Sequence, residues 1–464
     1  MRRVLTGVLF AACLQGQTID RTKPPETPPL PPFKIPAMTE SKLTNGLTLV
    51  TLQDNRFPLV TVRLAFPTGS RFDPKDKPGL AEAVASLLTE GTKSRVSRQI
   101  AEEVNEIGGS LSASASADSL ILAGSALSES TEKLIDLVAD VARNAMFPAD
   151  EVALYKQNRK QQLLEQRSQS EFLADEKVKE VVFGDHPYSR QNPTPQSIDA
   201  LDTAVLAGFR DRLLAPNQAV LILLGKLPAR PALLKVLEAK FAGWQKREVP
   251  APPSGPLPAA RRSITLVDRP GSVQADVHVG HLGITRTDPA YFALTVGNAI
   301  LGGGTASRLF NGIREKKGYA YSVYSYNQAQ KDAALFSAAM QVRNEVVGDA
   351  VAELLAELKK MANEPVSGQE LSSVKNYLSG NFVIRMQSQD ALATQIVTVK
   401  SMGLPKDYLE MYTQRIRSAE PDQILNAAKR VMDPETSALV VVGDAKQIKS
   451  KLDKLGTVDV VPSK

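Results

Sequence analysis

The sequence predicts an α+β fold built from two homologous lobes, because two unrelated features recur at nearly the same interval. A helical stretch ends shortly before Pro148 and another shortly before Pro365, 217 residues later. An apolar strand closes on Gly225 and another on Gly443, 218 residues later. Such a repeat indicates an internal duplication. Since each copy mixes strands with amphipathic helices, we expect each lobe to be an α/β sandwich.

Two proline-rich stretches mark the limits of the lobes. Seven prolines lie between Pro24 and Pro36, and a second cluster covers residues 249–258. Proline fixes φ and lacks a backbone donor, so neither stretch can belong to a helix or a central strand. The predicted parts are a signal peptide (1–16), a proline-rich linker (17–37), an N-terminal domain (38–248), a second linker (249–258) and a C-terminal domain (259–464).

The N-terminus resembles a secretory signal. Met1 to Arg3 is basic, and the apolar run from Val4 to Cys13 is too short to span a bilayer. Cys13, the single cysteine, follows Leu-Phe-Ala-Ala in a pattern similar to a bacterial lipobox. An ordinary signal peptide cut near Gly16 is the alternative. Either way the sequence predicts an exported, periplasmic protein of a bacterium, which is lipid-anchored if Cys13 is modified.

Composition excludes several classes of protein. Of 464 residues, 43% are hydrophobic and 23% charged, which rules out a disordered, collagen-like or coiled-coil chain. The net charge of +6 is spread thinly, and no basic stripe carries interleaved aromatic residues, so a nucleic-acid partner is not expected. Only three histidines are present, which argues against a histidine-rich metal site.

Local patterns predict the main elements of the first lobe. A Thr-Asn-Gly turn at 44–46 leads into a strand over 47–52, and a second strand covers 60–66. Residues 112–122 alternate small polar and apolar side chains, which is typical of one strand. Leu80, Val84, Leu87 and Leu88 share one face of a helix.

Other patterns in the chain have ordinary structural explanations. His278 and His281 lie three apart on an apparent strand, so their side chains should point to opposite faces. His186 precedes a proline in a loop and is expected to pack or to form a hydrogen bond. Gly302 to Gly304 lack the Lys-Ser/Thr that a phosphate-binding loop requires, and we expect them to open a helix tightly against a strand.

Four segments together resemble a known family. They are GLAEAVASLLTEGT at 79–92, IGG at 107–109, HPYSR at 186–190, and LGGGTASRL at 301–309 with REKKGYAY at 314–321. Their order and spacing resemble the pitrilysin/insulinase family of inverted-zincin metallopeptidases over nearly everything after residue 38. The resemblance implies two peptidase-like domains of the metallopeptidase-like (LuxS/processing-peptidase-like) type that form one half of a clam shell.

The resemblance also implies that the zinc site is degenerate. The family carries His-x-x-Glu-His on this helix, where two histidines one turn apart share a zinc ion and the glutamate acts as general base. Here Glu82 and Ser86 stand at the histidine positions and Ala85 at the glutamate position. The distal ligand falls near Gln161 or Gln162, and neither is a carboxylate. We therefore expect no metal and no cofactor in this chain, and no autonomous peptidase activity.

Two residues of the second-lobe segment keep the family's pattern. Arg314 and Tyr321 match the arginine and tyrosine that reach the zinc lobe and hold the substrate and its developing oxyanion. A guanidinium and a phenol are donors suited to that role. The resemblance therefore assigns Arg314 and Tyr321 as catalytic residues.

A substrate-binding edge is the last expectation from the resemblance. In the family, the strand after the Gly-Gly pair adds an extended peptide to the sheet. Gly108, Gly109, Ser110 and Ser112 are the matching residues here, and their small side chains would allow a close approach. A plain solvent-facing edge is the alternative.

Taken together, the resemblance implies a zinc-less, non-catalytic subunit of an exported heterodimeric metallopeptidase. Its partner would be a homologous peptidase subunit that carries the zinc, and its substrates would be extended peptides. The alternative is a peptide-binding or assembly scaffold, similar to the core proteins of respiratory complexes, with no role in proteolysis.

Overall fold

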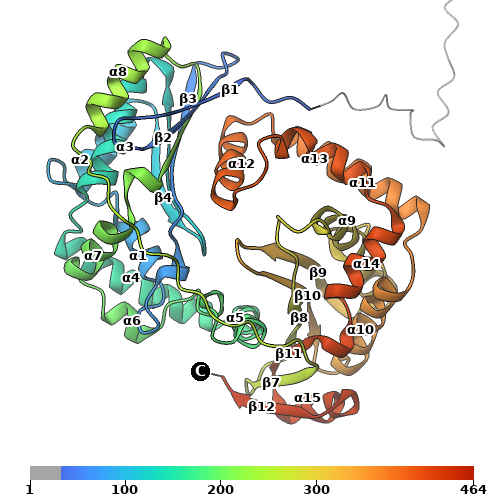
Figure 1. Ribbon diagram of the computed structural model, residues 1–464. Helices are drawn as coiled ribbons and strands as arrows, with labels where there is room; N and C mark the ends of the chain where they lie inside the picture. The colour runs from blue at the N-terminus through green and yellow to red at the C-terminus, as the bar shows by residue number, and fades with distance from the viewer. Residues whose placement is uncertain (1–32, 464) are drawn as a thin grey trace, which may run out of the picture. The chain divides into compact units, whose positions relative to one another are not determined.

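Two six-stranded sheets carry the fold of residues 33–463, which are the residues that the computed structural model describes (Figure 1). The signal peptide, Cys13 and nearly all of the first linker lie outside the described residues. Among the described helices, none combines the length and the apolar character that crossing a bilayer requires.

The first sheet is formed by the N-terminal half of the chain. In spatial order its strands are β1 (Met38–Lys42), β2 (Thr48–Gln53), β6 (Val220–Gly225), β3 (Leu59–Phe66), β5 (Leu120–Leu127) and β4 (Ser110–Ala115). The turn before β2 and the strands at 47–52 and 60–66 are confirmed within a residue or two. Gly46 makes this turn possible, because its φ of +82° is a conformation that side chains disfavour.

The second sheet repeats this topology. Its spatial order is β12 (Val458–Pro462), β7 (Ser263–Asp268), β11 (Ala438–Gly443), β8 (Gln274–Leu282), β10 (Ala334–Arg343) and β9 (Ala320–Ala329). β6 runs parallel to β2 and antiparallel to β3, and β11 has the same relation to β7 and β8. The predicted two-lobe α+β architecture is therefore confirmed. The copies differ at one edge, where β1 is antiparallel to β2 but β12 is parallel to β7.

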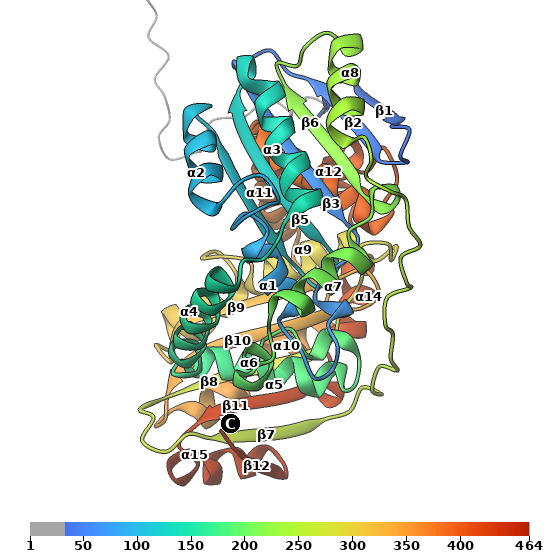
Figure 2. The same cartoon turned by 90° about the vertical axis from the view of Figure 1, so that its left-hand side faces the viewer.

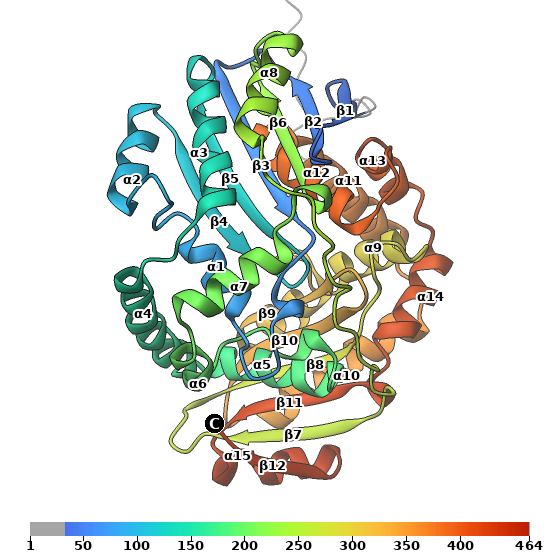
Figure 3. The same ribbon diagram turned by 60° about the vertical axis from the view of Figure 1, so that its left-hand side comes forward.

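Helices cover both faces of each sheet. In the first lobe they are α1 (Leu80–Leu87), α2 (Ser97–Glu106), α3 (Thr131–Asn144), α4 (Ala149–Arg167), α5 (Ser170–Phe183), α6 (Pro195–Asp199), α7 (Thr203–Leu213) and α8 (Arg230–Phe241). In the second they are α9 (Tyr291–Gly302), α10 (Val347–Asn363), α11 (Gly368–Arg385), α12 (Gln389–Met402), α13 (Tyr408–Arg417), α14 (Pro421–Val431) and α15 (Ala445–Leu452). Figure 3 shows α3 and α8 over one face of the first sheet.

The two lobes exchange helices. α5, from the first half of the chain, packs on β8 and β11 of the second sheet (Figure 2), while α12 packs on β3 and β6 of the first. Apolar side chains along β6 point alternately to the two faces of the first sheet, so helices must cover both faces. Leu221 and Leu223 belong to the core under α3 and α8, whereas Ile222 and Leu224 belong to the core that includes α12.

Two local predictions are wrong. Residues 112–122 are not one strand but a hairpin, because the chain reverses at 116–119, where the Ser116 N–H donates to the Ser119 carbonyl (2.8 Å). The small polar residues of the turn continue the alternation and so conceal it. Gly302 ends α9 rather than opening a helix. The predicted close packing against a strand is confirmed, because a Cβ on Gly302 would come within 2.5 Å of the Ser325 nitrogen on β9.

Candidate functional site

The site starts from α1, whose first turn is held by the half-buried carboxylate of Asp73. Asp73 accepts hydrogen bonds from the backbone N–H groups of Gly79 (2.8 Å) and Ala81 (2.9 Å) at the start of the helix. Burial raises the pKa of Asp73 to about 7, against the opposing effect of these backbone donors. Gly79 allows the entry into the helix with a φ of +88°. The segment 73–79 thus anchors α1 to the lobe.

Glu82 forms an ion pair with a residue that the sequence analysis missed. The guanidinium of Arg159 on α4 donates from Nε to Glu82 Oε1 (2.8 Å) and from Nη2 to Oε2 (3.4 Å), and from Nη1 to Gln166 Oε1 (3.0 Å). The Arg159 side chain is only 7% exposed, whereas that of Glu82 is 40% exposed. Arg159 lies three residues before Gln162, which is one helical turn, so the helix periodicity could have indicated it.

The other positions that the resemblance assigns to the zinc motif are placed as follows. Ser86 is exposed and lies beside Tyr155 on α4, and burial raises the pKa of Tyr155. Ala85 is buried. Gln162 is exposed on α4. The structure therefore brings Glu82 and Ser86 against α4, and their neighbours on that helix are Arg159 and Tyr155.

The histidines lie away from this helix pair. Within residues 33–463, no three His, Cys, Asp or Glu side chains are close enough together to share a metal ion. His278 is buried and its Nδ1 lies 3.1 Å from Ser337 Oγ, while His281 is half-buried, so the two point to opposite faces of β8 as predicted. His186 is buried and its Nδ1 accepts the Tyr188 N–H (3.3 Å), which confirms a packing and hydrogen-bonding role.

Arg314 and Tyr321 lie together at the edge of the second sheet. Arg314 belongs to a π-helical turn, Phe310–Lys316, and its guanidinium carbon lies 4.7 Å from the Phe310 ring centre and 4.8 Å from that of Tyr321. Its Nε also lies 3.7 Å from Glu315 Oε1, so cation–π contacts and one carboxylate together hold this cation. Tyr321 is the second residue of the edge strand β9 and is 77% exposed. The guanidinium of Arg314 and the phenol of Tyr321 are therefore held next to each other, with Arg314 half-buried and Tyr321 facing solvent.

The predicted substrate edge is the outer edge of the first sheet. β4 pairs only with β5 among the described strands, and its side chains alternate between exposed and half-buried. A Cβ on Gly109 would come within 2.5 Å of the Ser125 carbonyl oxygen, so this glycine is required by the close approach to β5. The hydroxyls of Ser110 and Ser125 lie 2.9 Å apart. Gly109 and Ser110 thus have structural roles within the hairpin, whether or not a peptide adds to its edge.

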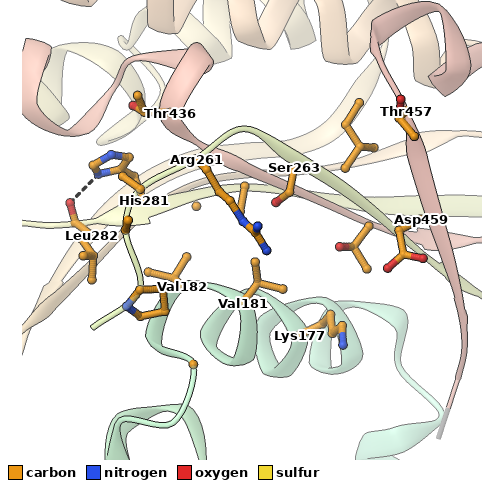
Figure 4. Close-up of a pocket in the computed structure, with 18 of the residues that line it drawn as sticks. Lys177, Val181, Val182, Arg261, Ser263, His281, Leu282, Thr436, Thr457 and Asp459 are labelled. Carbon is orange, nitrogen blue, oxygen red and sulfur yellow. Dashed lines mark hydrogen bonds between the residues drawn. The ribbon is translucent and has the colours of Figure 1, made fainter. Parts of the chain in front are cut away.

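A separate pocket of about 810 Å³ lies between α5 and the second sheet (Figure 4). Lys177, Arg261 and His281 line it together with apolar side chains, and His281 Nδ1 lies 2.7 Å from the Leu282 carbonyl oxygen. Its lining includes none of the predicted site residues. Local sequence patterns do not predict it, because its walls come from α5, the second linker and the strands β7, β8, β11 and β12.

Comparison with known proteins places the chain in one family. The model described as insulinase (peptidase family M16) matches residues 48–196, and that described as the peptidase M16 inactive domain matches residues 200–378. An uncharacterized zinc protease of Rickettsia felis is 26% identical over 411 residues, which are 86% of this chain and 96% of the relative. An uncharacterized zinc protease of Streptomyces coelicolor is 26% identical over 89% of this chain and 91% of its own length.

Solved structures share the architecture. A peptidase M16 inactive domain from Pseudomonas fluorescens has a TM-score of 0.82 at 25% identity and covers 88% of this chain and 98% of that chain. The periplasmic protease PqqL from Escherichia coli has a TM-score of 0.76 at 16% identity over 95% of this chain and 49% of that chain. With two matching family models that follow one another along the sequence, the chain belongs to the insulinase (M16) peptidase family.

Proposed function

We propose that this chain is the zinc-less subunit of an exported two-chain metallopeptidase. It supplies Arg314 and Tyr321 to a site whose zinc belongs to a homologous partner. The observation that carries the proposal is the Glu82–Arg159 ion pair on the two helices that the resemblance assigns to the zinc site. A divalent cation at Glu82 would have to displace or lie beside a buried guanidinium, and the two like charges repel strongly where water is scarce.

The proposed role of this chain is to stabilise negative charge on the substrate. When bound, the partner's zinc would activate the water that attacks the peptide. The Tyr321 hydroxyl would donate a hydrogen bond to the carbonyl oxygen as it becomes an oxyanion. Arg314 would hold the tyrosine ring by its cation–π contact and offer its remaining donors to the substrate backbone. The exposure of Tyr321 supports this role, since a donor that acts on another chain's substrate must be accessible.

Export rests on the basic start and short apolar run at the N-terminus. The proposal of an extended peptide substrate is based on the outer edge of β4, which pairs with no second strand among the described residues.

The test is turnover in a complex with a family member that carries an intact His-x-x-Glu-His motif. Tyr321→Phe keeps the ring over Arg314 but removes the donor, so kcat should fall about 100- to 1000-fold with the complex intact. Tyr377→Phe is the matched control, because Tyr377 is also an exposed tyrosine but lies on α11. If Tyr321→Phe leaves turnover unchanged in a complex verified by size-exclusion chromatography, the scaffold function replaces the one proposed.

A further inference from the structure

A second pocket, of about 650 Å³, lies where α9 packs on α13 and α14. We propose that it binds a small ligand with an anionic head, carboxylate or phosphate, and a short apolar body. None of its lining residues belongs to the proposed active site, so the inference does not depend on the proposed function. Its walls carry three arginines and one aspartate, a net charge of +2, together with aromatic side chains; the residues that argue for the ligand are Arg286, Asp288, Phe292, Tyr408, Arg415 and Arg430.

Arg286 is a half-buried cation in the wall of the pocket. Its Nε is buried and has no hydrogen-bond partner among the described residues. Its Nη1 has only a long contact, 3.5 Å, to the Tyr408 hydroxyl, and its guanidinium carbon lies 5.3 Å from the centre of the Tyr291 ring. The aromatic rings make the charge tolerable, but no carboxylate within residues 33–463 neutralises it. Charged groups that are partly withdrawn from water ordinarily have a partner of opposite charge, and the described residues supply none to Arg286.

Arg415 brings a second cation that is held in the same way. Its guanidinium carbon lies 5.4 Å from the Phe292 ring centre and 5.8 Å from that of Tyr408. In the described part of the chain it forms no ion pair either. Arg430 provides the contrast, because its two terminal nitrogens donate to both Asp288 oxygens at 3.1 and 2.7 Å. The pocket therefore satisfies one arginine and leaves two available.

The lining also specifies the kind of ligand. A guanidinium presents its donors in a planar fork that fits the oxygens of a carboxylate or a phosphate. Phe292, Leu404 and Pro405 offer apolar surface beside the cations, while Ser418 and Gln423 add polar groups. The volume is within the range of small-molecule sites. A compact anion with an aromatic or aliphatic body matches this combination better than an extended chain.

The test uses the full chain, purified in a buffer without phosphate or carboxylates, and isothermal titration with inorganic phosphate, phenyl phosphate and benzoate. We expect one saturable site for at least one of the two organic anions, and the order of their affinities identifies the head group. Arg415→Gln should weaken the tighter probe at least tenfold. Arg417→Gln is the matched control, because Arg417 is two residues further along α13 and does not line the pocket.

A second variant tests the half-buried Arg286. Arg286→Lys keeps the charge but loses the planar fork, so it should weaken binding while the thermal unfolding profile stays that of a folded protein. Two results would overturn the inference. One is the absence of saturable binding by all three probes. The other is equal weakening by Arg415→Gln and Arg417→Gln, which would indicate general attraction to a positively charged surface.

Discussion

At the residue scale, the two side chains of the ion pair between α1 and α4 differ in their exposure to solvent. Arg159 is 7% exposed and Glu82 is 40% exposed, so the two partners depend on each other to different degrees. A lone carboxylate at Glu82 can be hydrated, whereas a lone guanidinium at Arg159 would keep the neutral Gln166 but no carboxylate among its hydrogen-bond partners in the described part of the chain. The cost of a substitution should therefore depend on which charge is left behind.

Glu82→Gln should reduce the free energy of unfolding by about 2 kcal/mol, because it leaves the buried cation without its counter-charge. Arg159→Met should cost less, about 1 kcal/mol, since water screens the remaining carboxylate. Urea denaturation measures both. Lys160→Met is the control on the same helix, because its pair with Asp199 is largely exposed, and it should change stability by less than about 0.5 kcal/mol. A larger loss for Arg159→Met than for Glu82→Gln would contradict this account.

At the element scale, the exchange of α5 and α12 determines what the inner faces of the sheets contact. Val178 on α5 joins a core with Leu335 and Val440 of the second sheet, and Ile396 on α12 joins the core of Ile222 in the first. Helix α5 also brings charged side chains near β8. Glu171, Asp175 and Lys179 of α5 all influence the buried His278. Burial is the largest effect, and it lowers the pKa of His278 to about 4.

This pKa predicts a pH-dependent part of the stability. The ordinary pKa of histidine is 6.5, so between pH 4 and 6.5 the unfolded chain binds more protons at His278 than the folded one. The stabilisation is then complete above pH 6.5 and is lost as the pH falls toward 4. The full change is about 3 kcal/mol, because the pKa of His278 falls from 6.5 to about 4 on folding and each pH unit corresponds to about 1.4 kcal/mol.

The measurement compares the wild type with His278→Gln, which does not titrate and can still bond to Ser337. Urea denaturation at several pH values from 4.5 to 7.5 should show the difference between the two proteins growing as pH rises to 6.5. Asp73, whose raised pKa changes stability in the opposite direction over this range, is present in both proteins and cancels. Parallel stability curves would contradict the buried, neutral His278.

Local sequence explains much of the fold but little of the contact between its parts. The strand at 220–225 and its counterpart at 438–443 were predictable, because a continuous apolar run bounded by glycine needs no distant partner to be identified. The exchange of α5 and α12 was not, since an apolar helix face does not specify which sheet it covers. The same is true of the Glu82–Arg159 pair, whose members are 77 residues apart.

At the scale of the whole molecule, a buried polar network joins the two lobes. Asp118, in the turn between β4 and β5, accepts hydrogen bonds from the Tyr188 hydroxyl (2.6 Å) and from the Lys331 N–H (2.9 Å) in the turn between β9 and β10. The buried Arg71 contacts Asp118 at 3.2 Å and Asp332 at 2.7 Å. The Asp332 N–H completes the network by donating to the Tyr188 hydroxyl (3.3 Å). Beyond the exchanged helices, this network holds the β9–β10 turn against the first lobe.

Asp118→Asn should loosen that turn, because it removes the buried negative charge opposite Arg71 and weakens the acceptor for the Lys331 amide. A loss of about 2–4 kcal/mol in stability follows from leaving a buried cation with one remaining partner. Hydrogen–deuterium exchange should accelerate at the amides of Lys331 and Asp332, both of which donate into the network. Asp332→Asn is the control with the same chemistry, and since the Asp332 side chain is 48% exposed it should cost about 1 kcal/mol or less. Equal effects of the two variants would show that Asp118 is not the centre of the contact between the lobes.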